Sequence, residues 1–145
     1  MELPDDIYEQ IEILSASGND ACDDEDYDVA IVQWRRALDL LPEPKAQWEA
    51  FMWLNASIGD AYYQLGDYEA AQESLTEALE TPDGKESGFV HYMLGKTYLS
   101  IDDERASDAL LRAYQIEGRD IFDSDEDEGE GSLKVLQDKG LVQSH

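Results

Sequence analysis

The sequence predicts a protein built only from α-helices. Apolar residues recur at spacings of three and four along most of the chain, which places them on one face of a helix. No long stretch shows the apolar–polar alternation of a β-strand, and β-branched residues are not clustered. Short segments containing proline, glycine or aspartate separate the helical stretches. The chain has 145 residues, the size of a single domain.

The first two helices can be placed from the residues at their ends. The first should begin after Pro4, where two aspartates suit the positive end of the helix dipole, and end near Cys22. Asp26 stands where a capping residue would begin the second helix, and Pro42 should end it. The core-facing residues of the second helix should be Ala30, Trp34, Ala37, Leu38 and Leu41.

The third and fourth helices are separated by a glycine. The third should run from about Pro44 to Leu65, because proline suits a first helical turn and Gly66 acts as a stop signal. Asp67 is placed to cap the fourth helix, which should end before Pro82. The core-facing residues of the fourth helix should be Ala71, Leu75, Ala78 and Leu79.

Three further helices follow the same logic. Ser87 can cap the fifth helix, and the turn at residues 102–103 should lead into the sixth, which Gly118 closes. After an acidic stretch, residues 132–139 can form a short seventh helix that Gly140 ends. The sequence therefore predicts six main helices of similar length and one short helix at the C-terminal end.

Part of this pattern resembles a known repeat family. Residues 58–71, with their continuation to Pro82, resemble the tetratricopeptide repeat. The positions that carry the resemblance, where small residues let two helices cross and aromatic residues fill the gaps beside them, are Gly59, Tyr62, Gly66, Tyr68, Ala71 and Ala78. A second copy is visible at residues 94–113. The first copy is weaker, because Ala21 stands where the family has a tyrosine.

The resemblance implies three helix hairpins stacked as a short right-handed superhelix, with the first helix of each pair lining a concave face. The crossing glycines Gly18, Gly59 and Gly95 lie further apart than the family's period of about 34 residues. Loops, or the start of the third helix, should therefore carry insertions. We expect a repeat domain over residues 1–122, an acidic loop over 123–131, and a short capping helix and tail over 132–145.

The charge of the chain is strongly one-sided. The sequence holds 35 Asp and Glu against 10 Lys and Arg, a formal net charge of −25. Nucleic acids and anionic membranes both require a basic face, so neither is an expected partner. This surplus of negative charge favours a basic protein partner. The acids gather at residues 20–28 and 123–130, which are either solvated loops or docking surfaces for a cationic protein.

The remaining composition points to a cytoplasmic protein without catalytic machinery. The N-terminus lacks a signal-peptide pattern, and Cys22 is the single cysteine, as suits a reducing compartment. Two histidines, His91 and His145, leave little for histidine catalysis or zinc binding. Residues 123–134 begin like a calcium loop but carry Glu and Lys where glycine and a final carboxylate are required. We therefore expect no enzyme activity, no cofactor and no metal.

The repeat positions also predict a partner-binding site. The inner stripe of the first helix should be Glu12, Ser15, Asn19, Cys22 and Asp23. Over all three copies, the residues expected to touch a partner are Trp53, Asp60, Tyr63, Phe89, Tyr92, Glu12 and Asp23. Trp53 should be exposed, whereas Trp48 and its neighbours should pack in the core. The alternative is that the C-terminal segment, with Leu133, Leu136 and Leu141, folds back and covers the aromatic residues.

Two functions fit these features. Residues 53–68 and 113–122 resemble short bacterial tetratricopeptide proteins encoded beside polymorphic toxins, which implies an immunity protein that is monomeric alone and binds a basic toxin domain as a heterodimer. The alternative is a general adaptor or chaperone that holds a peptide or helix of a partner. Some members of the family grip acidic tails with inner-face cations. Here Lys96 stands among Glu12 and Asp60, so we expect an acidic tail to be repelled.

Overall fold

The structure, a computed structural model, describes residues 3–143, so His145 and the end of the expected C-terminal tail lie outside the described residues. The described residues form helices and no strand. The α-helices are α1 (Asp5–Asp23), α2 (Tyr27–Leu40), α3 (Glu49–Gln64), α4 (Tyr68–Leu79), α5 (Gly88–Ser100), α6 (Ala106–Glu117), α7 (Asp120–Asp123) and α8 (Gly129–Asp138). Short 3₁₀ turns cover Lys45–Gln47 and Gly84–Glu86.

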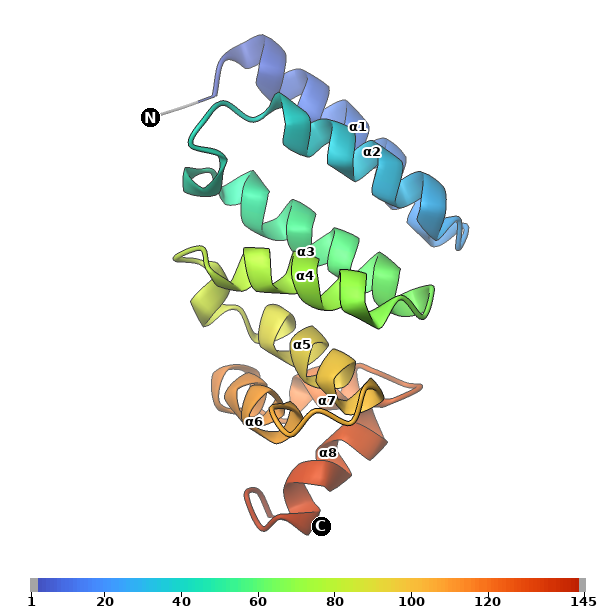
Figure 1. Ribbon diagram of the computed structural model, residues 1–145, viewed down its shortest axis with the longest axis vertical. Helices are drawn as coiled ribbons and strands as arrows, with labels where there is room; N and C mark the ends of the chain where they lie inside the picture. The colour runs from blue at the N-terminus through green and yellow to red at the C-terminus, as the bar shows by residue number, and fades with distance from the viewer. Residues whose placement is uncertain (1–2, 144–145) are drawn as a thin grey trace.

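The helices are arranged as three hairpins stacked in chain order (Figure 1). α1 packs on α2, α3 on α4 and α5 on α6, while α2 contacts α3 and α4 contacts α5. α8 lies at the end of the stack opposite α1 and packs against α6 and α7 (Figure 1). The expected all-α fold of tetratricopeptide-like hairpins with a C-terminal capping helix is confirmed.

Close helix crossings explain the spacing of the glycines. A Cβ atom added at Gly59 would lie 2.5 Å from the side chain of Leu75, and one added at Gly95 would lie 2.6 Å from the side chain of Leu110. Gly18 meets the indole of Trp34 in the same way. A larger residue at any of these positions would therefore push the two helices of a hairpin apart.

Two groups of buried side chains form the core. One joins α1, α2 and α3 and includes Trp34 and Ile58. The other extends from α3 to α8 and includes Leu75, Leu110 and Leu136. Burying each of these leucines fully stabilises the fold by about 1.5–3 kcal/mol. α3 contributes to both clusters, and α8 is part of the second.

The helix ends agree with most of the sequence signals. The Asp67 side chain accepts a hydrogen bond from the Ala70 backbone N–H at 3.2 Å, and Ser87 caps α5 in the same way. Gly118 has a positive φ of 71°, a conformation that side chains other than glycine rarely adopt. Asp26 occupies the N-cap position of α2 but makes no capping hydrogen bond there.

The start of the third helix differs from the prediction. α3 begins at Glu49 rather than near Pro44, because a 3₁₀ turn at Lys45–Gln47 precedes it. The Lys45 ammonium donates to the carbonyl oxygen of Leu41 at 2.7 Å and to two further carbonyl oxygens at the end of α2. These charge-assisted bonds satisfy carbonyl groups that a helix leaves unpaired at its C-terminal end. The insertion between the first two repeats is therefore a pinned connection.

The acidic stretch near the C-terminus is shorter and more ordered than a loop over 123–131. α7, which no sequence signal indicated, covers Asp120–Asp123, and α8 begins at Gly129. Residues 124–128 connect the two helices, and we call them the acidic segment. None of the helices in residues 3–143 combines the length and the apolar character that crossing a membrane requires.

Candidate partner-binding face

The inner stripes of α1, α3 and α5 divide into two regions with different surroundings. The first lies between α1 and the N-terminal part of α3, and we call it the open groove. The second lies between the C-terminal part of α3, α5 and the acidic segment, and we call it the closed region. The expected partner-binding residues are split between these regions and the surfaces beside them.

The open groove is a cavity of about 840 Å³. Its apolar lining includes Ile11, which is buried, Trp53, which is half-buried, and Tyr8, which is 54% exposed. Its acidic lining is Asp5, Glu12 and Glu49, and no Lys or Arg is among the described residues that line it. The groove therefore combines aromatic surface with negative charge, which suits a cationic and partly apolar ligand.

The wall of the groove is held by the connection between the first two hairpins. The Trp48 indole N–H donates to the carbonyl oxygen of Pro42 at 2.8 Å. Trp48 also lines the groove, so this bond fixes an aromatic side chain at its edge. The Lys45 ammonium pins the same connection to the end of α2, so two polar contacts hold this wall of the groove in place.

Ser15 lies in this groove with an unusual hydroxyl group. The residue is 6% exposed and lines the cavity. Its hydroxyl oxygen is buried and has no hydrogen-bond partner among residues 3–143. A buried polar atom without a partner costs about 1–3 kcal/mol, so a bound group that hydrogen-bonds Ser15 would recover part of that free energy.

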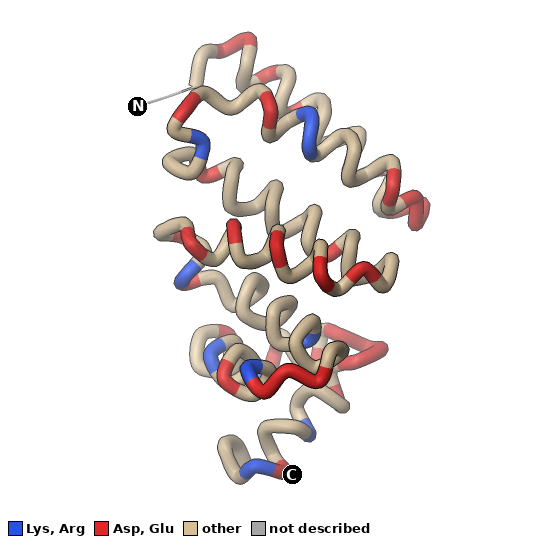
Figure 2. The backbone as a smooth tube through the Cα atoms, in the orientation of Figure 1, with Lys and Arg blue, Asp and Glu red and all other residues tan. Residues whose placement is uncertain are grey.

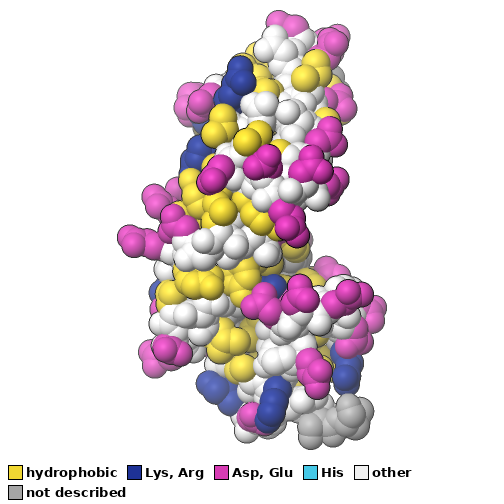
Figure 3. Space-filling view, turned by 90° about the vertical axis from the view of Figure 1, so that its right-hand side faces the viewer, with side chains coloured by type: hydrophobic (Ala, Val, Ile, Leu, Met, Phe, Trp, Pro, Cys, Tyr) yellow, Lys and Arg dark blue, Asp and Glu magenta, His cyan; other side chains and the backbone are white. Residues whose placement is uncertain are grey.

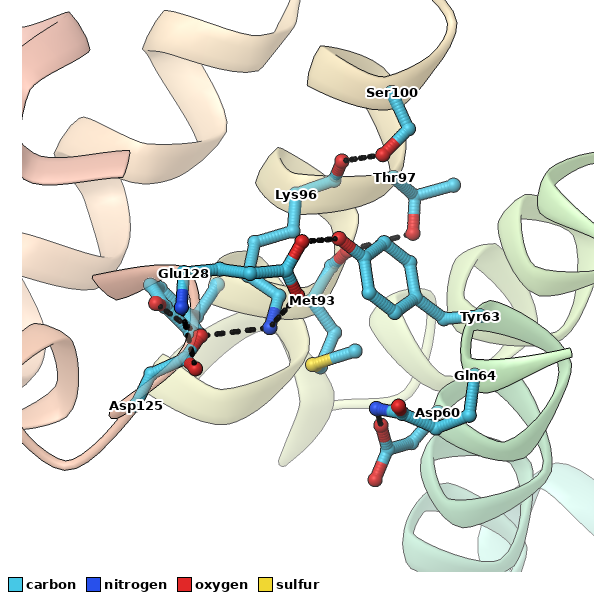
Figure 4. A network of polar contacts seen from close by, with 10 residues as sticks. Asp60, Tyr63, Gln64, Met93, Lys96, Thr97, Ser100, Asp125 and Glu128 are labelled. Atoms are coloured by element: carbon cyan, nitrogen blue, oxygen red, sulfur yellow. Dashed lines mark hydrogen bonds and ion pairs between the residues drawn. The ribbon is translucent and has the colours of Figure 1, made fainter. Parts of the chain in front are cut away.

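The closed region is centred on a buried lysine (Figure 4). Lys96 on α5 is 6% exposed, and its ammonium lies 2.7 Å from a carboxylate oxygen of Asp125 and 3.2 Å from one of Glu128. The hydroxyls of Tyr63 and Tyr92 donate to Glu128 and Asp125, each at 2.7 Å. Five side chains from three parts of the chain therefore satisfy one another's charge and hydrogen-bonding groups.

The aromatic rings add to the environment of the lysine. The Lys96 ammonium lies 4.9 Å from the centre of the Tyr63 ring and 5.3 Å from that of Tyr92. Tyr92 also packs edge-to-face on Phe122 of α7 at 5.0 Å between ring centres. An unpaired buried ammonium would cost several kcal/mol, so the acidic segment and the two rings make the burial of Lys96 possible.

The network shifts the pKa values of Asp125, Tyr63 and Tyr92. Partial burial opposes ionisation of Asp125, but hydrogen bonds from Lys96 and Tyr92 outweigh it and lower the pKa of that carboxyl. Burial and the neighbouring carboxylates raise the pKa of Tyr63 and of Tyr92. Both phenols therefore stay protonated at neutral pH and act as hydrogen-bond donors to the two carboxyl groups.

Asp60 lies beside this network but is not part of it (Figure 4). Its carboxylate accepts a hydrogen bond from the Gln64 side chain, one turn along α3, at 3.2 Å. Burial raises the pKa of Asp60, although the Gln64 amide and the charge of Lys96 act in the other direction. Asp60 is thus a half-buried acid whose negative charge is only partly compensated.

The structure gathers the predicted site residues only in part. Glu12 and Trp53 come together in the open groove, although Trp53 is half-buried rather than exposed. Tyr63 and Tyr92 come together in the closed region, where the acidic segment covers them. Phe89 is 42% exposed, and Asp23 is exposed at the end of α1. Phe89 and Asp23 lie outside both the open groove and the closed region, and so does Asp60.

Sequence reasoning missed several residues of both regions. Continuing the stripe that contains Glu12 by one helical turn towards the N-terminus would have found Tyr8. Trp48 packs against the first core cluster, as expected, and it also lines the groove, which the sequence did not indicate. Sequence reasoning also missed that Lys96 pairs with two acids of the chain itself.

The structure gives little support for other chemistry. Asp125, from the stretch that resembled a calcium loop, pairs with Lys96, and no group of three potential metal ligands occurs within residues 3–143. Burial and the neighbouring acids Asp60 and Asp23 raise the pKa of Cys22, which disfavours a reactive thiolate. His91 is half-buried with a ring nitrogen 2.9 Å from the carbonyl oxygen of Lys85.

Comparison with known proteins identifies the middle of the stack. Residues 54–82 match the family model of the tetratricopeptide repeat. The match covers most of α3 and all of α4, the hairpin whose crossing glycine is Gly59. No curated protein matches the chain. Because tetratricopeptide repeats bind other proteins, the match indicates a protein–protein interaction module.

Proposed function

We propose that this protein is an acidic immunity protein that binds a cognate, basic bacterial toxin domain and neutralises it by covering its surface. The observation that carries the proposal is the excess of 35 acidic over 10 basic residues on a scaffold of stacked hairpins. The mechanism requires no catalytic group in this chain. It requires a rigid surface whose charge and shape complement a cationic protein.

The distribution of charge supports long-range attraction of such a partner. Acidic residues occur on all three hairpins and in the acidic segment, and several of them lie on α4 (Figure 2). On the face drawn in Figure 3, acidic side chains are spread over the whole height of the molecule and outnumber basic ones. At physiological salt such charges act over about 8 Å and raise the association rate of an oppositely charged protein.

The inner face supplies contacts that charge alone lacks. We propose that Trp53 and Glu12 touch the partner in the open groove, and that Asp60, Phe89 and Asp23 extend the contact beside it. Tyr63 and Tyr92 use their hydroxyls on the chain's own acids, so we assign them to the support of the inner face rather than to its contact surface. A half-buried aromatic with acids around it has the composition of an interface hot spot.

The proposal is tested by reconstitution with a toxin domain encoded beside this protein in its native genome. We expect a one-to-one complex, an association rate that falls steeply between about 50 and 500 mM salt, and loss of toxin activity in the complex. A chain with exposed acids neutralised on α4 serves as a control for charge outside the inner face. Capture of only acidic or neutral proteins, or an association rate that ignores salt, would contradict the proposal.

A general adaptor or chaperone is the second candidate, because the repeat match supports peptide or helix binding equally well. The two functions differ in the state of the bound partner. An immunity protein abolishes the partner's activity at one equivalent, whereas an adaptor leaves it active and presents it to other proteins. Measuring the partner's activity in the purified complex separates them.

A further inference from the structure

We infer that the open groove between α1 and α3 binds a basic segment of the partner in which an apolar anchor side chain is flanked by Lys or Arg. The inference rests on the proposed function to the extent that the partner is a basic protein. It adds where on this chain the segment binds and which chemistry the segment must carry.

The apolar part of the groove calls for an apolar anchor. Trp53 is half-buried and Tyr8 is 54% exposed, and both face a cavity of about 840 Å³ whose lining also includes the buried Ile11. A cavity of this size and lining is in the range that accommodates a ligand side chain together with its neighbours. Filling it would remove aromatic surface from water on both sides of the interface.

The acidic part calls for flanking cations. Asp5 and Glu12 on α1 and Glu49 on α3 line the cavity, so acids stand on both of its walls. No basic residue among the described lining residues neutralises them. Lys or Arg side chains on either side of an anchor would meet a carboxylate on each wall, and their charges would also interact favourably with the rings of Tyr8 and Trp53.

Ser15 supplies an observation independent of charge. Its hydroxyl is buried within the groove and has no partner in residues 3–143, although a serine in a helix commonly bonds to the carbonyl one turn earlier. A peptide backbone carries both donors and acceptors, so it can either donate a hydrogen bond to this hydroxyl or accept one from it. The feature fits a polypeptide segment better than a purely apolar ligand.

The same features exclude two other occupants. A second copy of this chain carries a net charge of −25 and would bring like charges together at an acidic groove. The chain's own acidic segment is bound to Lys96 in the closed region, and no lysine or arginine among the described residues of the groove could hold it there. A basic segment of another protein remains as the complementary occupant.

The test uses three synthetic peptides of equal length labelled for fluorescence anisotropy. The first carries a leucine anchor between Lys and Arg residues, the second replaces the anchor by serine, and the third replaces the basic residues by glutamate. We expect the first to bind and the other two to bind at least about tenfold more weakly. Failure of the full-length protein to bind the first peptide up to about 1 mM would overturn the inference.

Substitutions in the groove locate the binding. Trp53→Ala and Glu12→Lys should each weaken binding of the first peptide by about tenfold or more, and the helical circular dichroism signal should stay unchanged. The matched controls are Ile101→Ala, at an apolar side chain that follows α5, is 43% exposed and lies outside the groove, and Glu73→Lys, a charge reversal on α4. Each should change affinity less than about threefold. Equal binding by wild type and both groove variants would show that the groove is not the site.

Failure of this inference can be told apart from failure of the proposed function. If the Trp53→Ala and Glu12→Lys variants still bind and neutralise the cognate toxin domain with wild-type affinity, the immunity function is supported and the groove is not the binding site. If the anchored basic peptide binds the groove as expected but no basic protein partner is neutralised, the groove assignment stands and the immunity function falls.

Discussion

The open groove and the closed region are both built from the inner stripes of neighbouring helices, yet their surroundings differ. In the groove, Trp53 and Glu12 border a cavity of about 840 Å³. In the closed region, Tyr63 and Lys96 are buried against acids contributed by the chain itself. Repeat position therefore predicts which way a side chain points, but not whether the space it faces is filled.

A single charge accounts for much of this difference. Lys96 gives the closed region a buried cation that attracts Asp125 and Glu128. The described lining of the groove contains acids and no cation, so no charge there attracts the acidic segment. In a chain with so few basic residues, the position of one lysine selects which half of the inner face closes on itself.

The largest effect is expected from loosening the helix that backs the closed region. Leu136→Ala on α8 removes a fully buried side chain and should lower the free energy of unfolding by about 3 kcal/mol. Urea denaturation measures the change. Leu141→Ala, at a side chain that is largely exposed, should change it by less than about 0.5 kcal/mol. Equal effects of the two substitutions would mean that α8 is not part of the core.

Removing the central charge should open the closed region while leaving the groove intact. Lys96→Met leaves Asp125 and Glu128 without their cation, and we expect a loss of about 2 kcal/mol, below the range for fully buried pairs because Glu128 is half exposed. Amide hydrogen exchange should accelerate over residues 124–128 and stay unchanged along α1. Lys134→Met, which breaks an exposed pair with Asp138, should cost less than about 0.5 kcal/mol.

The same network predicts how stability depends on pH. The pKa of Asp125 is lower in the folded than in the unfolded protein, so its contribution is present above the unfolded value of about 3.9 and is lost as pH falls through the folded pKa. Asp125→Asn should therefore flatten the acid limb of a stability–pH curve by about 1 kcal/mol. Glu126→Gln, at an exposed position next to it, should leave the limb unchanged.

Matched charge reversals in the two regions should give the smallest and sharpest contrast. Glu12→Lys in the groove places a cation among acids and should change the free energy of unfolding by no more than about 0.5 kcal/mol. Glu128→Lys places a second cation beside Lys96 and should cost about 1–2 kcal/mol. Thermal denaturation of both variants compares them. Similar melting temperatures would show that Glu128 is no more tightly paired than Glu12.

Much of the fold follows from the sequence because its signals are local. Helix caps such as Asp67 and Ser87 act within three residues, and Gly118 ends a helix through its own φ angle. The crossing glycines indicate closely packed helix pairs, because a larger residue at Gly59 or Gly95 would leave no room for the facing leucine. The length of α3 was misjudged because a 3₁₀ turn and an α-helix share the same proline and alanine preferences over their first residues.

The site was only half predictable from the sequence. The spacing of three and four residues placed Glu12 and Trp53 on an inner face, and both line the groove. It also placed Tyr63 and Tyr92 there, but their hydroxyls bond to residues 65 and 33 positions away in the chain. No local pattern indicates such a partner. Tertiary contacts decided which part of the inner face stays open. The buried ammonium of Lys96 must be paired, and the fold brings Asp125 and Glu128 within reach of it, so the acidic segment covers that part of the face.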